Sequence, residues 1–271
     1  EVCLTHDIDR LKKTYQYFTK FARTMNTKHL YTFFDSEEPY WCLDKIQEIE
    51  SGFGVKSTFF FLNETIKFNF VRPNTWKFSL GRYKINEPDI IEKIRELDSN
   101  GNEIGVHGSV LSYNDIELLA KEKHILEEII GKKIYGTRQH FLRFKYPETW
   151  KIHQRLGFKY DSTFGCRGKI GFIGKKYKSF EPFNDGFKVL PIAIMDTYLF
   201  SKKKNVEDYW NDCLEVINEA QANSATLVII WHNRCFYDLD YPNYTLIYKR
   251  IIEECLKRGA SFKTCSEALE I

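Results

Sequence analysis

Short apolar runs alternate along the chain with stretches whose apolar residues recur at helical spacing. The first run, Val2-Cys3-Leu4, is followed by a helical pattern from Leu11 to Phe21, and this order repeats about seven times. Alternation of short strands with helices is typical of βα units in a parallel sheet. The pattern therefore predicts an α/β fold of about seven such units, and it is compatible with closure of the sheet into a barrel.

The same pattern of apolar residues predicts where the later strands and helices begin and end. Further strands are predicted at 55–62, 103–106, 133–135, 158–160, 189–194 and 226–231, with Ser261-Phe262 able to close the sheet. Helices are predicted at 41–50, 88–97, 115–130, 147–157, 206–220 and 244–256. Residues 63–88 are irregular and aromatic, which indicates an insertion or long loop. We expect a single domain over residues 1–271.

Polar side chains recur where the predicted strands end, and in α/β barrels that end of the sheet builds the active site. They are Asp7, Asp9, His107, Arg138, His140, Asp161, Asp196 and His232. Asp7 and Asp9 are two residues apart on a strand, so both can face one pocket. Two close carboxylates repel each other unless a cation or a shared proton relieves them. A divalent metal is the simplest relief; the alternative is that the pair caps the Leu11 helix.

Composition narrows the class of protein without naming an activity. The net charge of +3 is too small to indicate nucleic acid, and no apolar stretch is long enough to cross a bilayer. Seven scattered cysteines without a Cys-x-x-Cys pair favour reduced thiols and a cytoplasmic location. Because the chain opens at Glu1 without a Met, the sequence leaves open both a missing N-terminal segment and export. His29, His124 and His153 are predicted to lie on the surface.

The order of the motifs resembles the polysaccharide deacetylase family with its NodB-homology domain. The motifs are Thr-His-Asp-Ile-Asp (5–9), Gly-Val-Lys-Ser-Thr-Phe-Phe (54–60), Glu-Ile-Gly-Val-His-Gly-Ser (103–109), Arg138, Tyr160-Asp161-Ser162 and Val-Ile-Ile-Trp-His (228–232). This resemblance covers essentially the whole chain. It implies a distorted (β/α)7 barrel and metal-dependent removal of acetyl groups from sugars or polysaccharides.

Carried over residue by residue, the resemblance assigns roles to five side chains. Asp7 matches the general base and Arg138 the arginine that orients it, while His232 matches the late histidine that acts as an acid. Asp9 and His107 match metal ligands. A divalent ion, with zinc favoured and cobalt or nickel as alternatives, suits a site of carboxylate and imidazole donors.

One position departs from the family pattern. The metal motif usually has two histidines four residues apart, which places the second at position 111, where this chain has Leu111. We take His140 as the third metal ligand because it lies two residues beyond Arg138 and can share its face; an ordinary packing or substrate-facing histidine is the alternative. His6 is a second candidate, although strand alternation turns it away from Asp7.

Three functions remain open at this stage. The first is a metal-dependent hydrolase that removes an acetyl group from an N-acetylated sugar or glycan. In the second, the same barrel hydrolyses a different amide or a formyl group, because Leu111 and the 63–88 segment would reshape the cleft. The third is a non-catalytic carbohydrate-binding descendant that has lost its metal. The oligomeric state is not predicted.

Overall fold

The computed structural model describes residues 1–35, 38–202 and 204–271. Eight parallel strands form one curled sheet in the order β6-β5-β4-β3-β2-β1-β8-β7. The strands are β1 (Val2–Ile8), β2 (Ser57–Leu62), β3 (Glu103–Gly108), β4 (Gly136–Gln139), β5 (Tyr160–Asp161), β6 (Lys188–Val189), β7 (Ile194–Met195) and β8 (Leu227–Ile230). This confirms the predicted parallel α/β fold.

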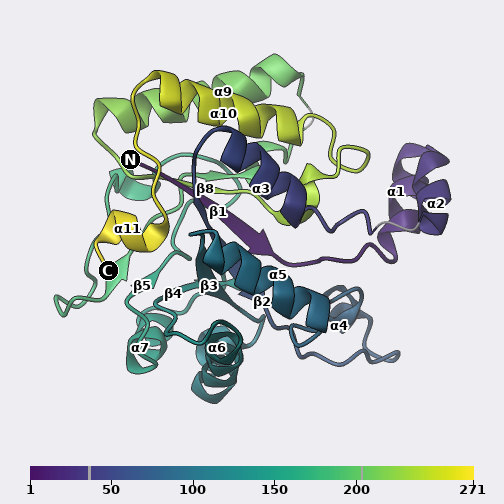
Figure 1. Cartoon of the computed structure of the whole chain (residues 1–271), viewed down its shortest axis with the longest axis horizontal. Helices are drawn as coiled ribbons and strands as arrows, with labels where there is room; N and C mark the ends of the chain where they lie inside the picture. The colour runs from purple at the N-terminus through teal and green to yellow at the C-terminus, as the bar shows by residue number, and fades with distance from the viewer. Residues whose placement is uncertain (36–37, 203) are drawn as a thin grey trace.

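Helices cover the outside of the curled sheet. Figure 1 shows α9 and α10 on one side of it and α5, α6 and α7 on the other, whereas α1 and α2 project beyond it. The helices are α1 (Gln16–Thr24), α2 (Lys28–Tyr31), α3 (Leu43–Gly52), α4 (Pro73–Ser79), α5 (Pro88–Ser99), α6 (Ile116–Ile130), α7 (Glu148–Arg155), α8 (Asp196–Leu199), α9 (Val206–Ala222), α10 (Tyr244–Lys257) and α11 (Cys265–Leu269). Among the described helices, none is long and apolar enough to cross a bilayer.

Short 3₁₀ turns connect several strands to the helices that follow. They are η1 (Thr32–Phe34), η2 (Ser112–Asn114), η3 (His140–Leu142), η4 (Ile173–Lys175) and η5 (Asn233–Phe236). Two of them, η3 and η5, directly follow strands β4 and β8 at the carboxyl end of the sheet. The segment 63–88 is not wholly irregular, because α4 begins there with Pro73 in its first turn, where a missing N–H costs nothing.

Strand β1 is buried on both faces, and successive side chains point alternately to the outer and the inner face of the sheet. Leu4 and Ile8 join the large apolar cluster formed with the surrounding helices. Cys3 points to the other face, into a smaller cluster inside the curled sheet with Phe60 and Tyr160. Period-two geometry places Asp7 on this inner face as well. The fold therefore directs the polar end of β1 into the barrel interior.

Two predicted strands differ from the structure. The strand expected at 133–135 lies at 136–139, because pairing with β3 begins beyond Gly136, whose α-carbon packs against the Tyr160 ring so closely that a Cβ would collide with it. The strand expected at 189–194 is divided into β6 and β7, which pair with opposite edges of the sheet. Pro191 lies in the gap, where its lack of an N–H prevents continued pairing.

Two histidines predicted to lie on the surface are buried. His29 is 1% exposed, with Nδ1 3.0 Å from Asp240 Oδ1. His153 is fully buried, with Nδ1 3.3 Å from Asp161 Oδ2. The prediction was wrong because each ring lies beside a buried carboxylate that is distant in sequence or on another element, which the local sequence does not reveal.

Candidate functional site

All six residues selected from the sequence as catalytic or metal-binding lie together at the carboxyl end of the sheet. Asp7 is in β1, His107 in β3 and Arg138 in β4; Asp9 and His140 directly follow a strand, and His232 lies two residues beyond β8. Five of the six line a cavity of about 220 Å³, and the sixth, Arg138, lies behind Asp7. The residues lining that cavity are Asp7, Asp9, His107, His140, Phe141, Leu142, Met195, Thr197, Tyr198, His232 and Arg234.

Arg138 fixes one oxygen of Asp7. Its guanidinium is fully buried, and Nη1 donates to Asp7 Oδ1 at 2.7 Å and to Thr5 Oγ1 at 2.8 Å. Nε and Nη2 donate to the carbonyl and hydroxyl oxygens of Ser162, and the group lies 4.3 Å from the centre of the Phe60 ring. Burial alone would raise the pKa of Asp7, but the Arg138 charge outweighs it and lowers that pKa. Asp7 is therefore a buried, oriented carboxylate.

Asp9, His107 and His140 form a compact set of donors whose ligand atoms all lie within 4.8 Å of one another. Asp9 Oδ1 is 3.3 Å from His107 Nε2 and 3.5 Å from His140 Nε2, and it is buried without a hydrogen-bond partner. His107 Nδ1 lies 2.9 Å from the Arg138 carbonyl oxygen, to which it can only donate. Its other nitrogen, Nε2, faces Asp9 and is the one placed to coordinate a metal.

This donor set fits a divalent cation. Two imidazoles and one carboxylate are typical ligands of zinc and similar metals. Burial lowers the pKa of His140 well below its usual range, so the ring is neutral and able to coordinate. Burial would raise the pKa of Asp9, but the polar and charged groups around the carboxylate, the Arg234 guanidinium among them, hold it well below its usual range. Within the described residues, no other group of three such side chains is close enough to hold a metal.

His232 stands opposite this set and is held by a second carboxylate. Its Nδ1 lies 2.8 Å from Asp196 Oδ1, and its backbone N–H donates to Asp196 Oδ2 at 2.7 Å. Burial would lower the pKa of His232, yet the buried Asp196 carboxylate outweighs it and raises that pKa. The free Nε2 points to Asp9, 3.7 Å from Oδ2. His232 is thus an oriented imidazole that holds a proton more strongly than usual.

Sequence reasoning missed the contributions of two residues. Asp196 was noticed only as a polar residue at a strand end, and its pairing with His232 had no local signal because 36 positions separate them. Arg234 was not noticed; its Nη1 donates to Asp9 Oδ2 at 2.8 Å, on the oxygen that does not face His107. Its place two residues after His232 was the available signal.

The position of the missing histidine is outside the site. The side chain of Leu111 is half-exposed at the surface. His6, the other ligand considered, turns to the outer face of β1, where its ring nitrogens meet the Trp231 carbonyl oxygen at 2.8 Å and Glu50 of α3 at 2.7 Å. Strand alternation therefore separates His6 from Asp7, as the period-two pattern indicated.

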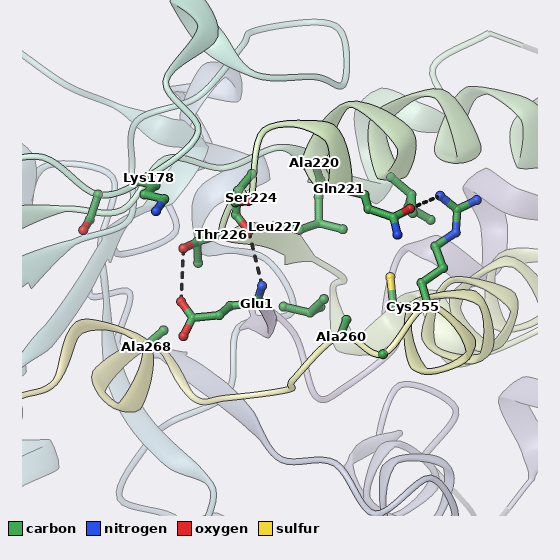
Figure 2. A pocket seen from close by; sticks show the side chains of 16 residues that line it. Glu1, Lys178, Ala220, Gln221, Ser224, Thr226, Leu227, Cys255, Ala260 and Ala268 are labelled. Carbon is green, nitrogen blue, oxygen red and sulfur yellow. Dashed lines mark hydrogen bonds between the residues drawn. The ribbon is translucent and has the colours of Figure 1, made fainter.

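A larger cavity, of about 550 Å³, lies at the opposite, amino end of the sheet. Figure 2 shows that its lining residues include Glu1, Gln221 and Cys255, from the chain start and from α9 and α10. Arg258 there already donates to Gln221 Oε1 at 3.0 Å, and Glu1 pairs with Lys263 at 2.6 Å. Among the described residues, its lining has no histidine and no cluster of metal-ligating side chains, so we place the chemistry in the smaller cavity.

Comparison with known proteins identifies the fold. No family model matches the sequence, and no curated protein matches it. Among solved structures, a candidate polysaccharide deacetylase from Mycobacterium smegmatis has a TM-score of 0.63 and 19% identity over 99% of this chain and 88% of its own. PuuE allantoinase has a TM-score of 0.60 and 14% identity, covering 99% of this chain and 88% of its own.

A third structure of this kind is a CE4 family pseudoenzyme from Bacillus anthracis. It has a TM-score of 0.55 and 13% identity, covering 99% of this chain and 64% of its own. Deacetylases, an allantoinase and a pseudoenzyme therefore share one architecture, so the likeness establishes the fold and not the reaction. The chain has the barrel fold of the polysaccharide deacetylases.

Proposed function

We propose that this chain is a metal-dependent hydrolase that removes an acetyl group from an N-acetylated sugar or glycan, with residues 1–271 acting as one catalytic domain. The observation that carries the proposal is the donor set of Asp9, His107 and His140 beside the Asp7–Arg138 pair. The cavity of about 220 Å³ is small for a binding pocket, which favours a short acyl group. Seven unpaired cysteines support a reducing compartment such as the cytoplasm.

Asp9, His107 and His140 would hold the cation, with zinc as our first choice. When bound, it would supply Lewis-acid polarisation of the acyl carbonyl and a water-derived nucleophile at neutral pH. Asp7 would accept the proton of the attacking water. Because Arg138 holds Asp7 Oδ1 and lowers the pKa of the carboxyl, the base stays ionised and Oδ2 is left for the proton.

His232 would deliver a proton to the leaving nitrogen. An amine is a poor leaving group unless it is protonated as the C–N bond breaks, so an oriented acid is needed. The Asp196 carboxylate fixes Nδ1 and raises the pKa of the ring, which favours the protonated form that an acid needs. The base and the acid thus belong to opposite sides of the same cavity.

A second candidate keeps the site and changes the bond. The similarity to PuuE allantoinase shows that this barrel is not restricted to proteins named as sugar deacetylases. In this alternative the chain hydrolyses another amide or a formyl group with the same residues. The pseudoenzyme neighbour motivates a third outcome, in which the protein binds a glycan without hydrolysing it.

The test is acetate release by zinc- or cobalt-loaded protein from N-acetylglucosamine oligomers and other N-acetylated sugars. We expect Asp7→Asn to lower the rate by about 100- to 10,000-fold, the usual contribution of a positioned base. Glu1→Gln at the amino-end cavity is the control and should retain the wild-type rate. Release confined to non-acetyl amides would select the second candidate, and binding without hydrolysis would reject catalysis.

A further inference from the structure

Positive charge is concentrated in two segments at the active-site end of the sheet. Residues 10–34, which follow β1, contain six of the 40 Lys and Arg residues and none of the 37 Asp and Glu residues. Residues 65–84, which follow β2, contain five more and again no acidic residue. The remainder of the chain is therefore acidic. The small net charge of the whole chain conceals this separation.

The same two segments expose a large share of the apolar surface. Half of the 16 large hydrophobic side chains exposed in the described structure lie in them, although the segments make up only a sixth of the chain. They are Phe18 (63% exposed), Met25 (72%), Tyr31 (69%), Phe33 (56%), Phe34 (83%), Phe68 (50%), Phe70 (76%) and Val71 (83%). Exposed apolar groups gathered in this way usually mark an interaction surface. We call the described, exposed side chains of residues 10–34 and 65–84 the aromatic–cationic surface.

The two segments meet beside the candidate metal site. Arg10 donates to the Leu80 carbonyl oxygen, and Arg82 Nη1 donates to the carbonyl oxygen of Asp9 at 2.8 Å. The Phe78 ring of α4 lies 5.7 Å from Phe141, which in turn stacks at 4.1 Å on His140. Figure 1 shows β1 running toward the side on which α1 and α2 project. The aromatic–cationic surface therefore borders the mouth of the cavity.

A buried ionic cluster holds the projecting helices to the barrel. Lys13 Nζ lies 2.7 Å from Asp240 Oδ1, with both side chains fully buried, and Tyr40 donates to Asp240 Oδ2 at 2.6 Å. His29 of α2 reaches the same carboxylate, and Lys20 of α1 donates to the Asp240 carbonyl oxygen at 2.7 Å. Breaking a buried pair is costly because it leaves an unpaired charge. The exposed aromatic residues are therefore presented on an anchored element.

We propose that the aromatic–cationic surface binds the surface of a membrane that contains anionic lipids. Interfacial binding needs basic residues for the lipid headgroups together with Trp, Phe or Leu side chains that enter the acyl boundary. A soluble polyanion would match the basic residues equally well. It would leave Phe34 and Val71, each 83% exposed, in water, so the apolar content favours the membrane.

The experiment is co-sedimentation of the full chain with vesicles of phosphatidylcholine alone or with 30% phosphatidylserine. We expect binding only to the anionic vesicles, and weaker binding at high salt. Arg23→Gln with Lys28→Gln should weaken binding about 25-fold, at about fivefold for each charge near the surface. Phe34→Ser with Val71→Ser should weaken it at least fivefold without unfolding the protein, because both side chains are exposed.

Matched controls lie at the end of α10, beside the amino-end cavity. Leu256→Ser removes an apolar side chain that is 38% exposed, and Lys257→Gln removes an exposed cation; both should bind as wild type. Failure of the wild-type protein to co-sediment with anionic vesicles would overturn the proposal. Equal loss in the α10 controls would also overturn it. If heparin binds the protein tightly and Phe34→Ser with Val71→Ser leaves vesicle binding unchanged, the partner is a polyanion instead. None of these readouts depends on hydrolytic activity.

Discussion

The two ends of the sheet differ in both cavity size and chemistry. At the amino end, a cavity of about 550 Å³ is bordered by Glu1 and Arg258, which pair with Lys263 and Glu254. At the carboxyl end, a cavity of about 220 Å³ receives two carboxylates and three imidazoles, all buried. The larger cavity therefore lies at one end of the sheet and the buried acidic and imidazole side chains at the other. Parallel strands explain the separation, because the last side chains of several strands converge at one end only.

The largest expected effect comes from removing a proposed metal ligand at the carboxyl end. We expect His140→Ala to weaken zinc binding by more than about 100-fold, because loss of even an outer hydrogen-bond partner of a ligand costs 10- to 100-fold. Isothermal titration with zinc, with metal content measured after dialysis, provides the measurement. Gln221→Ala at the amino-end cavity is the control and should bind zinc as wild type. Equal affinity in both variants would remove His140 from the site and reopen the question of the third ligand.

Much of the candidate site at the carboxyl end could be predicted from the sequence, because side chains alternate between the two faces of a strand. Asp7 and Asp9 are two residues apart on β1, so their common side and the exclusion of His6 follow from strand geometry. Contacts between distant elements were not accessible. Asp196 reaches His232 because it follows β7, which pairs with β8. The residues near Asp196 and near His232 in the sequence give no indication of this contact.

The predicted strand boundaries were wrong for a related reason, namely that they depend on neighbouring elements. The run at 133–135 has β-forming residues, yet pairing with β3 begins at 136–139, since a strand needs a neighbour as well as propensity. The burial of His153 likewise depends on Gln139 and Asp161, which belong to other elements. Sequence patterns predict the face on which a side chain lies better than they predict its partner.

An intermediate effect is expected from the residue that holds the proposed acid. Asp196→Asn should lower the turnover number by about 10- to 100-fold, because His232 loses the carboxylate that orients it and raises its pKa. With a lower pKa, His232 loses its proton earlier as the pH rises, so the alkaline limb of the rate profile should move to lower pH. The pH dependence of acetate release measures both changes.

The control for this variant is Asp212→Asn, whose carboxylate pairs with Lys204 at the surface of α9. It should retain the wild-type profile. An alkaline limb that stays in place in Asp196→Asn would mean that His232 is not the group that titrates, and that Asp196 acts only by positioning the backbone through the His232 N–H.

The smallest expected effect is on stability, and it comes from Glu122, a buried side chain near the site that has no cationic partner among the described residues. Glu122 of α6 is 1% exposed and accepts from the Ser109 N–H at 3.1 Å; burial raises its pKa from 4.5 to about 7. The folded state therefore binds more protons than the unfolded state between these values, and stability from this group is lost as the pH rises from 5 to 7. The loss amounts to about 2 kcal/mol.

Glu122→Gln should remove this pH dependence, because an amide does not titrate. Urea unfolding of metal-free protein at pH 5 and pH 7 measures it, with Glu117→Gln on the exposed side of the same helix as the control. We expect the free energy of unfolding of wild type and Glu117→Gln to fall by about 2 kcal/mol more than that of Glu122→Gln. Parallel decreases in all three proteins would mean that Glu122 titrates as a solvated carboxyl, and that its burial does not raise its pKa.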